Sequence, residues 1–182
     1  MTLVLVEGAS DRVALETLAA RLGRDLVAEG VEVRELGGAT NVAKVLAEQL
    51  GARQGLRVAG LYDEPEERFF VRGLELAGLG PVEDRQRLEQ LGFFACVRDL
   101  EDELIRAVGE RRMIEVIEEQ GELTSFRLLQ RQPVQRSWTL HDQLRRFLSA
   151  RSGHKLTYAR ALVEVLDLTA VPRPLELLLS RV

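Results

Sequence analysis

Leu3-Val4-Leu5-Val6-Glu7-Gly8 is a run of aliphatic residues that ends in a carboxylate and a glycine, and Asp11 follows three positions later. An uninterrupted aliphatic run is typical of a strand that is buried on both faces of a parallel sheet. Ligands of open α/β sheets bind at the carboxyl ends of such strands, so Glu7 is a candidate acid, base or metal ligand. An acidic residue at this position can instead have a purely structural role at the start of the next helix. For that helix we expect Ser10 to be the N-cap. The other strands decide between these interpretations.

The composition predicts one compact α/β protein with a helical appendage. A chain of 182 residues with 46% hydrophobic content can bury most of its apolar surface. It has no apolar run approaching about 18 residues and no basic, cleavable leader, so we expect a cytoplasmic protein without a membrane span. The single cysteine, Cys96, excludes a disulfide framework within one chain and is expected to be buried. The net charge of −4 argues against a broadly basic nucleic-acid-binding surface but leaves a local one open.

Short apolar runs alternate with helical patterns over the first hundred or so residues. In the helical patterns, apolar residues recur every three or four positions. This alternation predicts a parallel sheet of about four strands, with right-handed crossover helices on its faces. The expected strands are residues 3–6, 31–36, 56–62 and 93–97, and the expected helices begin near Ser10, Thr40 or Asn41, Glu66 and Val82.

From Glu101 onward, amphipathic spacing predicts only helices. We therefore divide the chain into an α/β domain, residues 1–110, and a helical C-terminal extension, residues 111–182, packed on it. The extension could cover one face of the sheet, hold substrate or form a homodimer contact, and amphipathicity does not choose among these roles.

The helical part carries the chain's other candidate functional residues. A solvated helix face and a phosphate-contacting surface explain its basic cluster equally well. We expect His141 and His154 to be surface residues, because neither has a carboxylate at metal-ligand spacing. Trp138 is expected to pack against the helices rather than to stack on a base. The basic cluster consists of Arg145, Arg146, Arg151, His154, Lys155 and Arg160.

Acidic residues follow three of the four predicted strands, whose carboxyl ends meet at one edge of a parallel sheet. Crowded carboxylates repel one another and raise one another's pKa unless a divalent cation binds them. Carboxylate oxygens suit Mg²⁺ or Mn²⁺ rather than zinc, and two such ions can contact the attacking and leaving oxygens of a phosphodiester displacement. The residues are Glu7 and Asp11 after the first strand, Asp63, Glu64, Glu66 and Glu67 after the third, and Asp99 and Glu101 after the fourth.

These acidic segments resemble the Toprim domain of topoisomerases, primases and overcoming-lysogenization-defect (OLD) nucleases. Glu-Gly-x-x-Asp at 7–11 and the Leu-Glu pair at 100–101 fit the OLD nuclease branch better than the topoisomerase or primase patterns. The resemblance covers residues 1–110 and implies a Rossmannoid, three-layer α/β fold, as in stand-alone Toprim nucleotidyl transferase/hydrolase proteins. Further on, Ser152-Gly153-His154-Lys155-Leu156 resembles the segment that supplies a catalytic lysine in that branch.

The resemblance implies a role for each acidic residue. Glu7 and Asp11 would bind metal, with Glu7 also able to act as general acid or base. Asp99 and Glu101 would complete the metal shell from the fourth strand, and Lys155 would stabilise charge on the phosphate oxygens. The next two residues, Asp102 and Glu103, are expected to face solvent.

The chain departs from the family at one metal ligand. Asp63 would be the first carboxylate of an Asp-x-Asp motif, but Pro65 occupies the second position. Pro65 fixes its own φ and biases Glu64 toward an extended conformation. We therefore expect Glu66 or Glu67, at the start of the next helix, to replace the missing ligand.

The resemblance implies a Mg²⁺- or Mn²⁺-dependent nuclease or nicking endonuclease that acts on nucleic acid, DNA rather than RNA, in a process such as DNA repair. The nearest relatives carry an ATPase domain ahead of the Toprim domain, so a separately encoded ATPase partner is expected. The alternative is a non-catalytic nucleic-acid-binding or assembly module with a degraded site. Pro65 and the acidic net charge favour this alternative.

Overall fold

Four parallel strands form the centre of the molecule in the computed structural model, which describes residues 1–151 and 153–182. Their order in the sheet is β2-β1-β3-β4, and the predicted strand positions are confirmed to within a residue or two. Ser152, part of the lysine-bearing motif, lies outside the described residues. The strands are β1 (Thr2–Val6), β2 (Val31–Glu35), β3 (Arg57–Asp63) and β4 (Phe93–Cys96).

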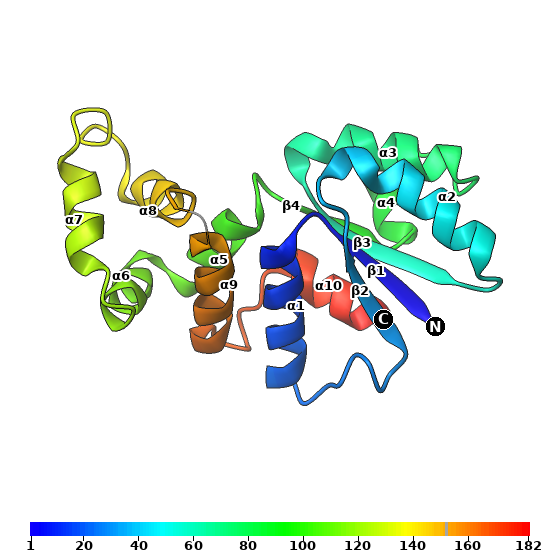
Figure 1. The fold of residues 1–182 in the computed structure, drawn as a ribbon, viewed down its shortest axis with the longest axis horizontal. Helices are drawn as coiled ribbons and strands as arrows, with labels where there is room; N and C mark the ends of the chain where they lie inside the picture. The colour runs from blue at the N-terminus through cyan, green and yellow to red at the C-terminus, as the bar shows by residue number, and fades with distance from the viewer. Residues whose placement is uncertain (152) are drawn as a thin grey trace.

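Helices cover both faces of this sheet, which gives the expected three-layer α/β arrangement (Figure 1). One face packs against α2 (Val42–Ala52), α3 (Glu67–Leu76) and α4 (Arg85–Gln90). The other face packs against α1 (Ala9–Arg21) and α10 (Arg173–Arg181). The alternation of side chains along β1 separates two cores, since Leu3 and Leu5 belong to the first layer and Val4 and Val6 to the second.

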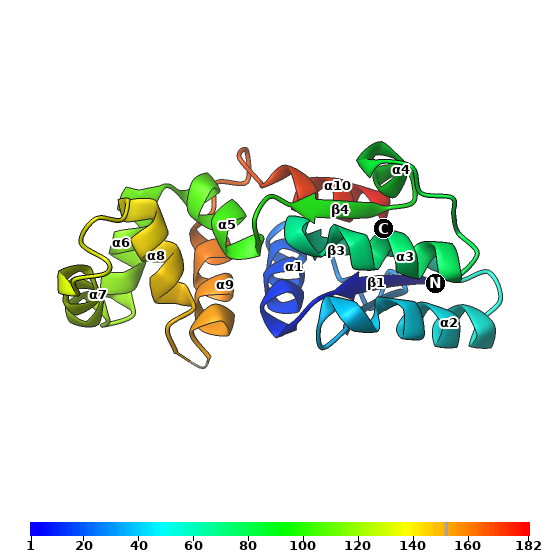
Figure 2. The ribbon, with the colours of Figure 1, turned by 90° about the horizontal axis from the view of Figure 1, so that it is seen from above.

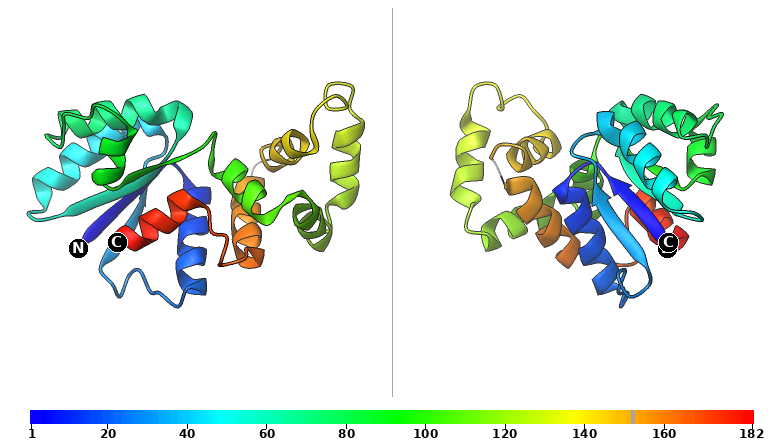
Figure 3. Two further views of the ribbon diagram at one scale, coloured as in Figure 1. Left: turned by 180° about the vertical axis from the view of Figure 1, so that it is seen from behind. Right: turned by 45° about the vertical axis from the view of Figure 1, so that its right-hand side comes forward.

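The helical part extends from one end of the sheet and then returns to it. Figure 2 shows α6, α7 and α8 lying beyond α5 and α9, away from the strands. The last helix, α10, lies against β3 and β4 on the same face as α1 (Figure 3). The helices of this part are α5 (Leu100–Val108), α6 (Glu110–Glu119), α7 (Leu123–Arg131), α8 (Leu140–Leu148) and α9 (His154–Val165).

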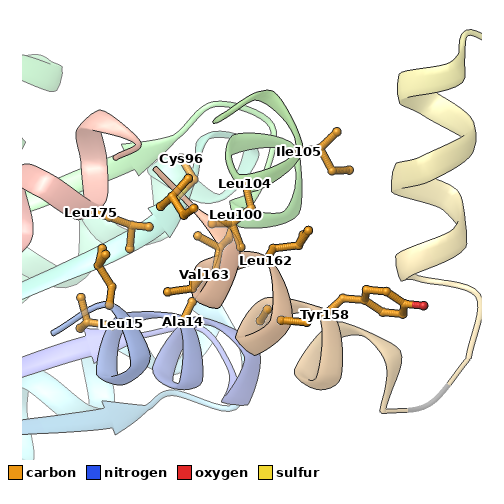
Figure 4. Packing of buried hydrophobic residues seen from close by; sticks show 14 of the residues in the cluster. Ala14, Leu15, Cys96, Leu100, Leu104, Ile105, Tyr158, Leu162, Val163 and Leu175 are labelled. Carbon is orange, nitrogen blue, oxygen red and sulfur yellow. The ribbon is translucent and has the colours of Figure 1, made fainter. Parts of the chain in front are cut away.

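Helix α9 joins the helical part to the α/β layers by packing on α1. Figure 4 shows Leu162 and Val163 of α9 beside Ala14 of α1, within a continuous buried cluster that also includes Cys96 and Leu104. Two hydrogen bonds reinforce this contact, because Arg21 Nη1 donates to the carbonyl oxygens of Val163 at 2.7 Å and Leu166 at 2.6 Å. The position of α9 is therefore fixed by the α/β layers.

Both histidines contact a carboxylate, and the expected surface placement was wrong for His154, whereas His141 is partly exposed. His154 is buried, with Nδ1 3.1 Å from the Phe147 carbonyl oxygen and Nε2 3.1 Å from Glu122 Oε1. His141 Nε2 lies 2.8 Å from Asp102 Oδ1. The spacing argument considered only sequence neighbours, whereas Asp102 lies on α5 and Glu122 is the N-cap residue of α7. Among the described residues, no helix is long and apolar enough to cross a membrane.

Gly60 is predicted to be essential to the pairing of the two central strands. A Cβ atom at this position would lie 2.6 Å from the Leu5 carbonyl oxygen and 3.0 Å from the Phe93 ring. We expect Gly60→Ala to lower the free energy of unfolding by about 1–3 kcal/mol, measured by urea denaturation. The matched control is Gly51→Ala in α2, where a Cβ atom meets nothing within 4 Å. That control should be neutral or stabilising, and equal effects of the two changes would contradict the assignment.

Candidate metal centre

The acidic residues gather at the carboxyl ends of three strands that are neighbours in the sheet. Glu7 directly follows β1, Asp63 ends β3, and Asp99 lies just beyond β4. The chain places β2 on one side of β1 and β3 on the other, so the sheet order reverses between β1 and β3. Open α/β sheets bind ligands at such a reversal point. The predicted convergence of these carboxylates thus has a structural basis in the strand order.

Glu7 is held between the ends of the two central strands. Its Oε1 atom accepts a hydrogen bond of 2.8 Å from the Asp63 backbone N–H. Burial raises the pKa of the Glu7 carboxyl, and the negative charges of Glu66 and Glu101 raise it further, against the opposing effects of this hydrogen bond and of Lys155. Glu7 thus remains near other acidic groups without a direct cationic partner among the described residues.

Asp11 lies in the first turn of α1 and faces the same group of acidic residues. Its Oδ2 accepts a hydrogen bond of 2.8 Å from the Gly8 backbone N–H, and Gly8 is the N-cap residue of the helix. The expectation that Ser10 is the N-cap was wrong, because the helix already begins at Ala9. Burial, followed by the charges of Glu101 and Glu7, raises the pKa of Asp11 to about 7.

The Asp63 carboxyl at the end of β3 also has a raised pKa. Burial comes first, and then the charges of Glu7, Asp11, Asp99 and Glu101 raise its pKa to about 8. A carboxylate with such a pKa is costly to ionise at neutral pH unless positive charge is nearby. A cation bound at this edge of the sheet would therefore favour the ionised form of Asp63.

The helical part supplies the nearest positive charge. Lys155, in the first turn of α9, donates to Glu101 Oε2 at 3.1 Å. Burial opposes the charge on Lys155, but Glu101 and neighbouring carboxylates outweigh it and raise the pKa of the lysine. Lys155 is therefore protonated at neutral pH, and it lies next to an acidic residue of the predicted metal shell.

Asp99 differs from the other predicted ligands because its charge is already compensated. It caps α5, accepting from the Asp102 backbone N–H at 2.9 Å, and its Oδ2 accepts from Arg145 Nε at 2.9 Å. Burial raises the pKa of Asp99, but the hydrogen bonds from Arg145 and Asp102 outweigh it, so the net shift is downward. Asp99 as a metal ligand stays a prediction.

The acidic residues around Pro65 are divided between two environments. Arg85 binds Glu64 Oε1 through Nη1 at 2.9 Å and Glu67 Oε2 through Nε at 2.7 Å, and Tyr62 also donates to Glu67. Glu66 has no ion-pair partner among the described residues and acts electrostatically on Glu7. Of the two predicted substitutes for the missing aspartate, this geometry favours Glu66.

Asp102 and Glu103 are buried, so the expectation that they face solvent was wrong. Asp102 accepts from His141, Arg98 and Arg106. Glu103 Oε1 accepts from the Val97 backbone N–H at 2.8 Å and pairs with Arg106. Helical spacing alone did not reveal that α8 covers this side of α5, nor that the flanking arginines neutralise both carboxylates.

The donor set fits Mg²⁺ or Mn²⁺ in its chemistry but does not form a preassembled cage. Within residues 1–151 and 153–182, no group of three or more His, Cys, Asp or Glu side chains is arranged to hold a metal ion. Mg²⁺ usually keeps several water ligands and uses only one or two carboxylates together with substrate phosphates. The all-oxygen donor set meets that requirement, and a bound cation would favour the ionised forms of Glu7, Asp11 and Asp63, whose pKa values are raised in its absence.

Comparisons with known proteins agree with this architecture. Residues 2–63 match the family model "Overcoming lysogenization defect protein-like, TOPRIM domain". No curated protein matches the chain. The C-terminal region of the Xanthomonas campestris pv. campestris OLD protein superposes with a TM-score of 0.75 at 23% identity, covering 98% of this chain and 90% of that one. The C-terminal region of the Burkholderia pseudomallei OLD protein gives 0.73 at 22% identity, covering 99% and 95%. The predicted fold is confirmed, and residues 2–63 are similar to the OLD-like Toprim family.

The repulsion at Asp63 predicts an unusual pH dependence of stability. Because its folded pKa of about 8 exceeds the ordinary aspartate value of about 4, its contribution to stability is complete below about pH 4 and is lost as the pH rises to 8. We expect Asp63→Asn, without added metal, to raise the free energy of unfolding at pH 8 by about 1–2 kcal/mol, a fraction of the full shift because the carboxyl is part exposed.

Asp99→Asn provides the contrast within the same site. The folded pKa of Asp99 is lowered, so its contribution is present above the unfolded pKa and is lost only as the pH falls through the folded value. This variant should therefore be less stable than the wild type at pH 8. Urea denaturation between pH 4 and pH 8 checks both signs, and a destabilised Asp63→Asn variant at pH 8 would contradict the electrostatic account.

Proposed function

We propose that this chain, an OLD-like Toprim domain with a helical extension, hydrolyses phosphodiester bonds in DNA with the help of Mg²⁺ or Mn²⁺. The observation that carries the proposal is the grouping of Glu7, Asp11 and Asp63, without ion-pair partners among the described residues, at the reversal point of the sheet. Lys155 lies at the border of this group. If these acidic residues served only to cap helices, they would not need to lie close enough to raise one another's pKa. A site for a cation and an anionic substrate accounts for this arrangement.

The proposed metal ligands are the acidic groups that have no arginine partner among the described residues. Glu7, Asp11 and Asp63 would hold the ion together with Glu101, and Glu66 would take the place of the missing aspartate. When bound, the ion would supply the positive charge that activates water and stabilises the leaving oxygen. Glu67 and Asp99 stay predictions as ligands, since arginines already occupy their oxygen atoms.

Two residues of the chain are proposed to act on the substrate. The raised pKa of Glu7 brings its carboxyl closer to neutral pH, where a general acid or base is most effective. The Lys155 ammonium would donate a hydrogen bond to a non-bridging phosphate oxygen and stabilise the charge that develops there. Its contact with Glu101 would orient it toward the metal site in the absence of substrate.

A second candidate function is a DNA-binding or assembly module without catalysis. Pro65 supports it, because the second position of the carboxylate motif has no side-chain donor and Arg85 engages both Glu64 and Glu67. The expected separately encoded ATPase partner is supported by the family resemblance alone. The homodimer and the cytoplasmic location stay predictions from the sequence.

Glu7→Gln tests the catalytic proposal, with plasmid nicking in Mn²⁺ as the measurement. We expect the wild type to nick and the variant to be slower by about 100-fold or more, because the amide neither transfers a proton nor binds the ion strongly. The matched control is Glu118→Gln, which makes the same change on an exposed face of α6 and should retain full activity.

Two further outcomes separate the candidate functions. Retained DNA binding with no cleavage by the wild type in either Mg²⁺ or Mn²⁺ would favour the non-catalytic module. Cleavage by Glu7→Gln at the wild-type rate would show that nicking comes from another site or from a contaminant. Thermal unfolding of each variant without metal verifies that the fold is intact.

A further inference from the structure

A cavity of about 580 Å³ opens beside the carboxylate group, within the size range of small-molecule binding sites. Residues of α5, α8, α9 and the segment that precedes α8 line it. Figure 1 shows these three helices next to one another. Asp99, Glu101 and Lys155 belong both to its lining and to the candidate metal centre. A ligand in this cavity would therefore lie directly next to a phosphate at the proposed metal site.

The charged lining of the cavity has one cation in excess. Four basic and three acidic residues line it, and each of the three acidic residues already has a basic partner. Asp142 pairs with Arg98 at 3.2 Å, while Asp99 and Glu101 pair with Arg145 and Lys155. Arg146 is the lining cation without an ion-pair partner in the described part of the chain, and its side chain is exposed. The cavity is therefore suited to an anionic group.

Trp138 contributes an aromatic surface to the same lining. It is the only tryptophan of the chain and is 40% exposed, so the expected packing against the helices leaves part of this residue accessible. Its backbone is held in place, because its N–H donates to the Gln135 carbonyl oxygen at 3.0 Å. The buried Gln143 side chain donates to that same oxygen at 2.8 Å. An exposed indole ring on a fixed backbone can stack against a flat ring of a ligand, provided that this ring is not already covered on both faces.

We propose that this cavity binds an unpaired nucleotide of a DNA strand, with its base stacked on Trp138 and its phosphate contacting Arg146. The inference rests on the proposed function for its choice of DNA, and it adds a preference for single-stranded or locally unpaired substrate. A base inside a duplex has both faces covered by its neighbours, so only an unstacked base can lie on the indole ring. The adjoining phosphate would then lie toward Lys155 and the carboxylates.

Trp138 is also the probe that tests the proposal, because it is the only tryptophan in the chain. A short oligothymidylate is titrated into the full chain in EDTA, which prevents cleavage. We expect saturable quenching of the tryptophan fluorescence by the single strand and much weaker quenching by a duplex of equal length. Absence of quenching by the single strand, or equal quenching by the duplex, would overturn the assignment.

Variants measured by anisotropy of a labelled oligonucleotide separate the two contacts. Trp138→Ala should weaken single-strand binding by about 5- to 150-fold, the usual effect of removing one stacking side chain, whereas Trp138→Phe should retain most of the affinity. Arg146→Ala should reduce the slope of log K against log salt by about 0.7, as expected for one lost phosphate contact. The matched control, Arg111→Ala on α6, has a side chain 95% exposed and should change neither quantity.

Failure of this inference can be distinguished from failure of the proposed function. If the wild type does not cleave in Mn²⁺ but quenching and the two variant effects occur, the hydrolytic function fails and the nucleotide site stands. If cleavage occurs but Trp138→Ala and Arg146→Ala bind single strands as the wild type does, the nucleotide site is wrong. If Trp138→Ala is unfolded by circular dichroism, Trp138→Phe and Arg146→Ala still decide the question.

Discussion

The hydrogen bond from the Asp63 backbone N–H to Glu7 Oε1 joins the ends of the two central strands, and the site is built around it. It requires β1 and β3 to pair directly, in a register that places Leu5 opposite Gly60. Gly60 permits this close approach because it has no Cβ atom. The same pairing forces two partly buried carboxyl groups together, so the architecture of the sheet itself creates the electrostatic repulsion that a cation would relieve.

The helical part completes this site as well as extending the fold. Lys155 and Arg145 come from α9 and α8, and each contacts one acidic residue at the start of α5. Because α9 packs against α1 through Leu162 and Val163, the lysine is positioned by the same core that supports β1. The carboxylates of the α/β layers and the cations of the helices thus meet at one boundary, next to the cavity lined by Trp138.

Local sequence patterns predicted the strands, the parallel sheet and the acidic residues after β1, β3 and β4, because these features depend on neighbouring residues. Contacts between distant segments could not be predicted in this way. Arg145 neutralises Asp99 from 46 positions away, and His141 contacts Asp102 across two helices. Exposure of Trp138 likewise depends on how the segment before α8 is held. Because helical spacing does not reveal such contacts, it led to the wrong expectation that Asp102 and Glu103 face solvent.

The most direct test of the central claim is a crystal structure of the chain grown with Mn²⁺, with data collected at a wavelength where manganese scatters anomalously. The account predicts an anomalous peak at the carboxyl ends of β1 and β3, bounded by the side chains of Glu7, Asp11 and Asp63. Absence of a peak at full Mn²⁺ saturation, or a peak only at surface carboxylates remote from this edge, would contradict the assignment of a metal centre here.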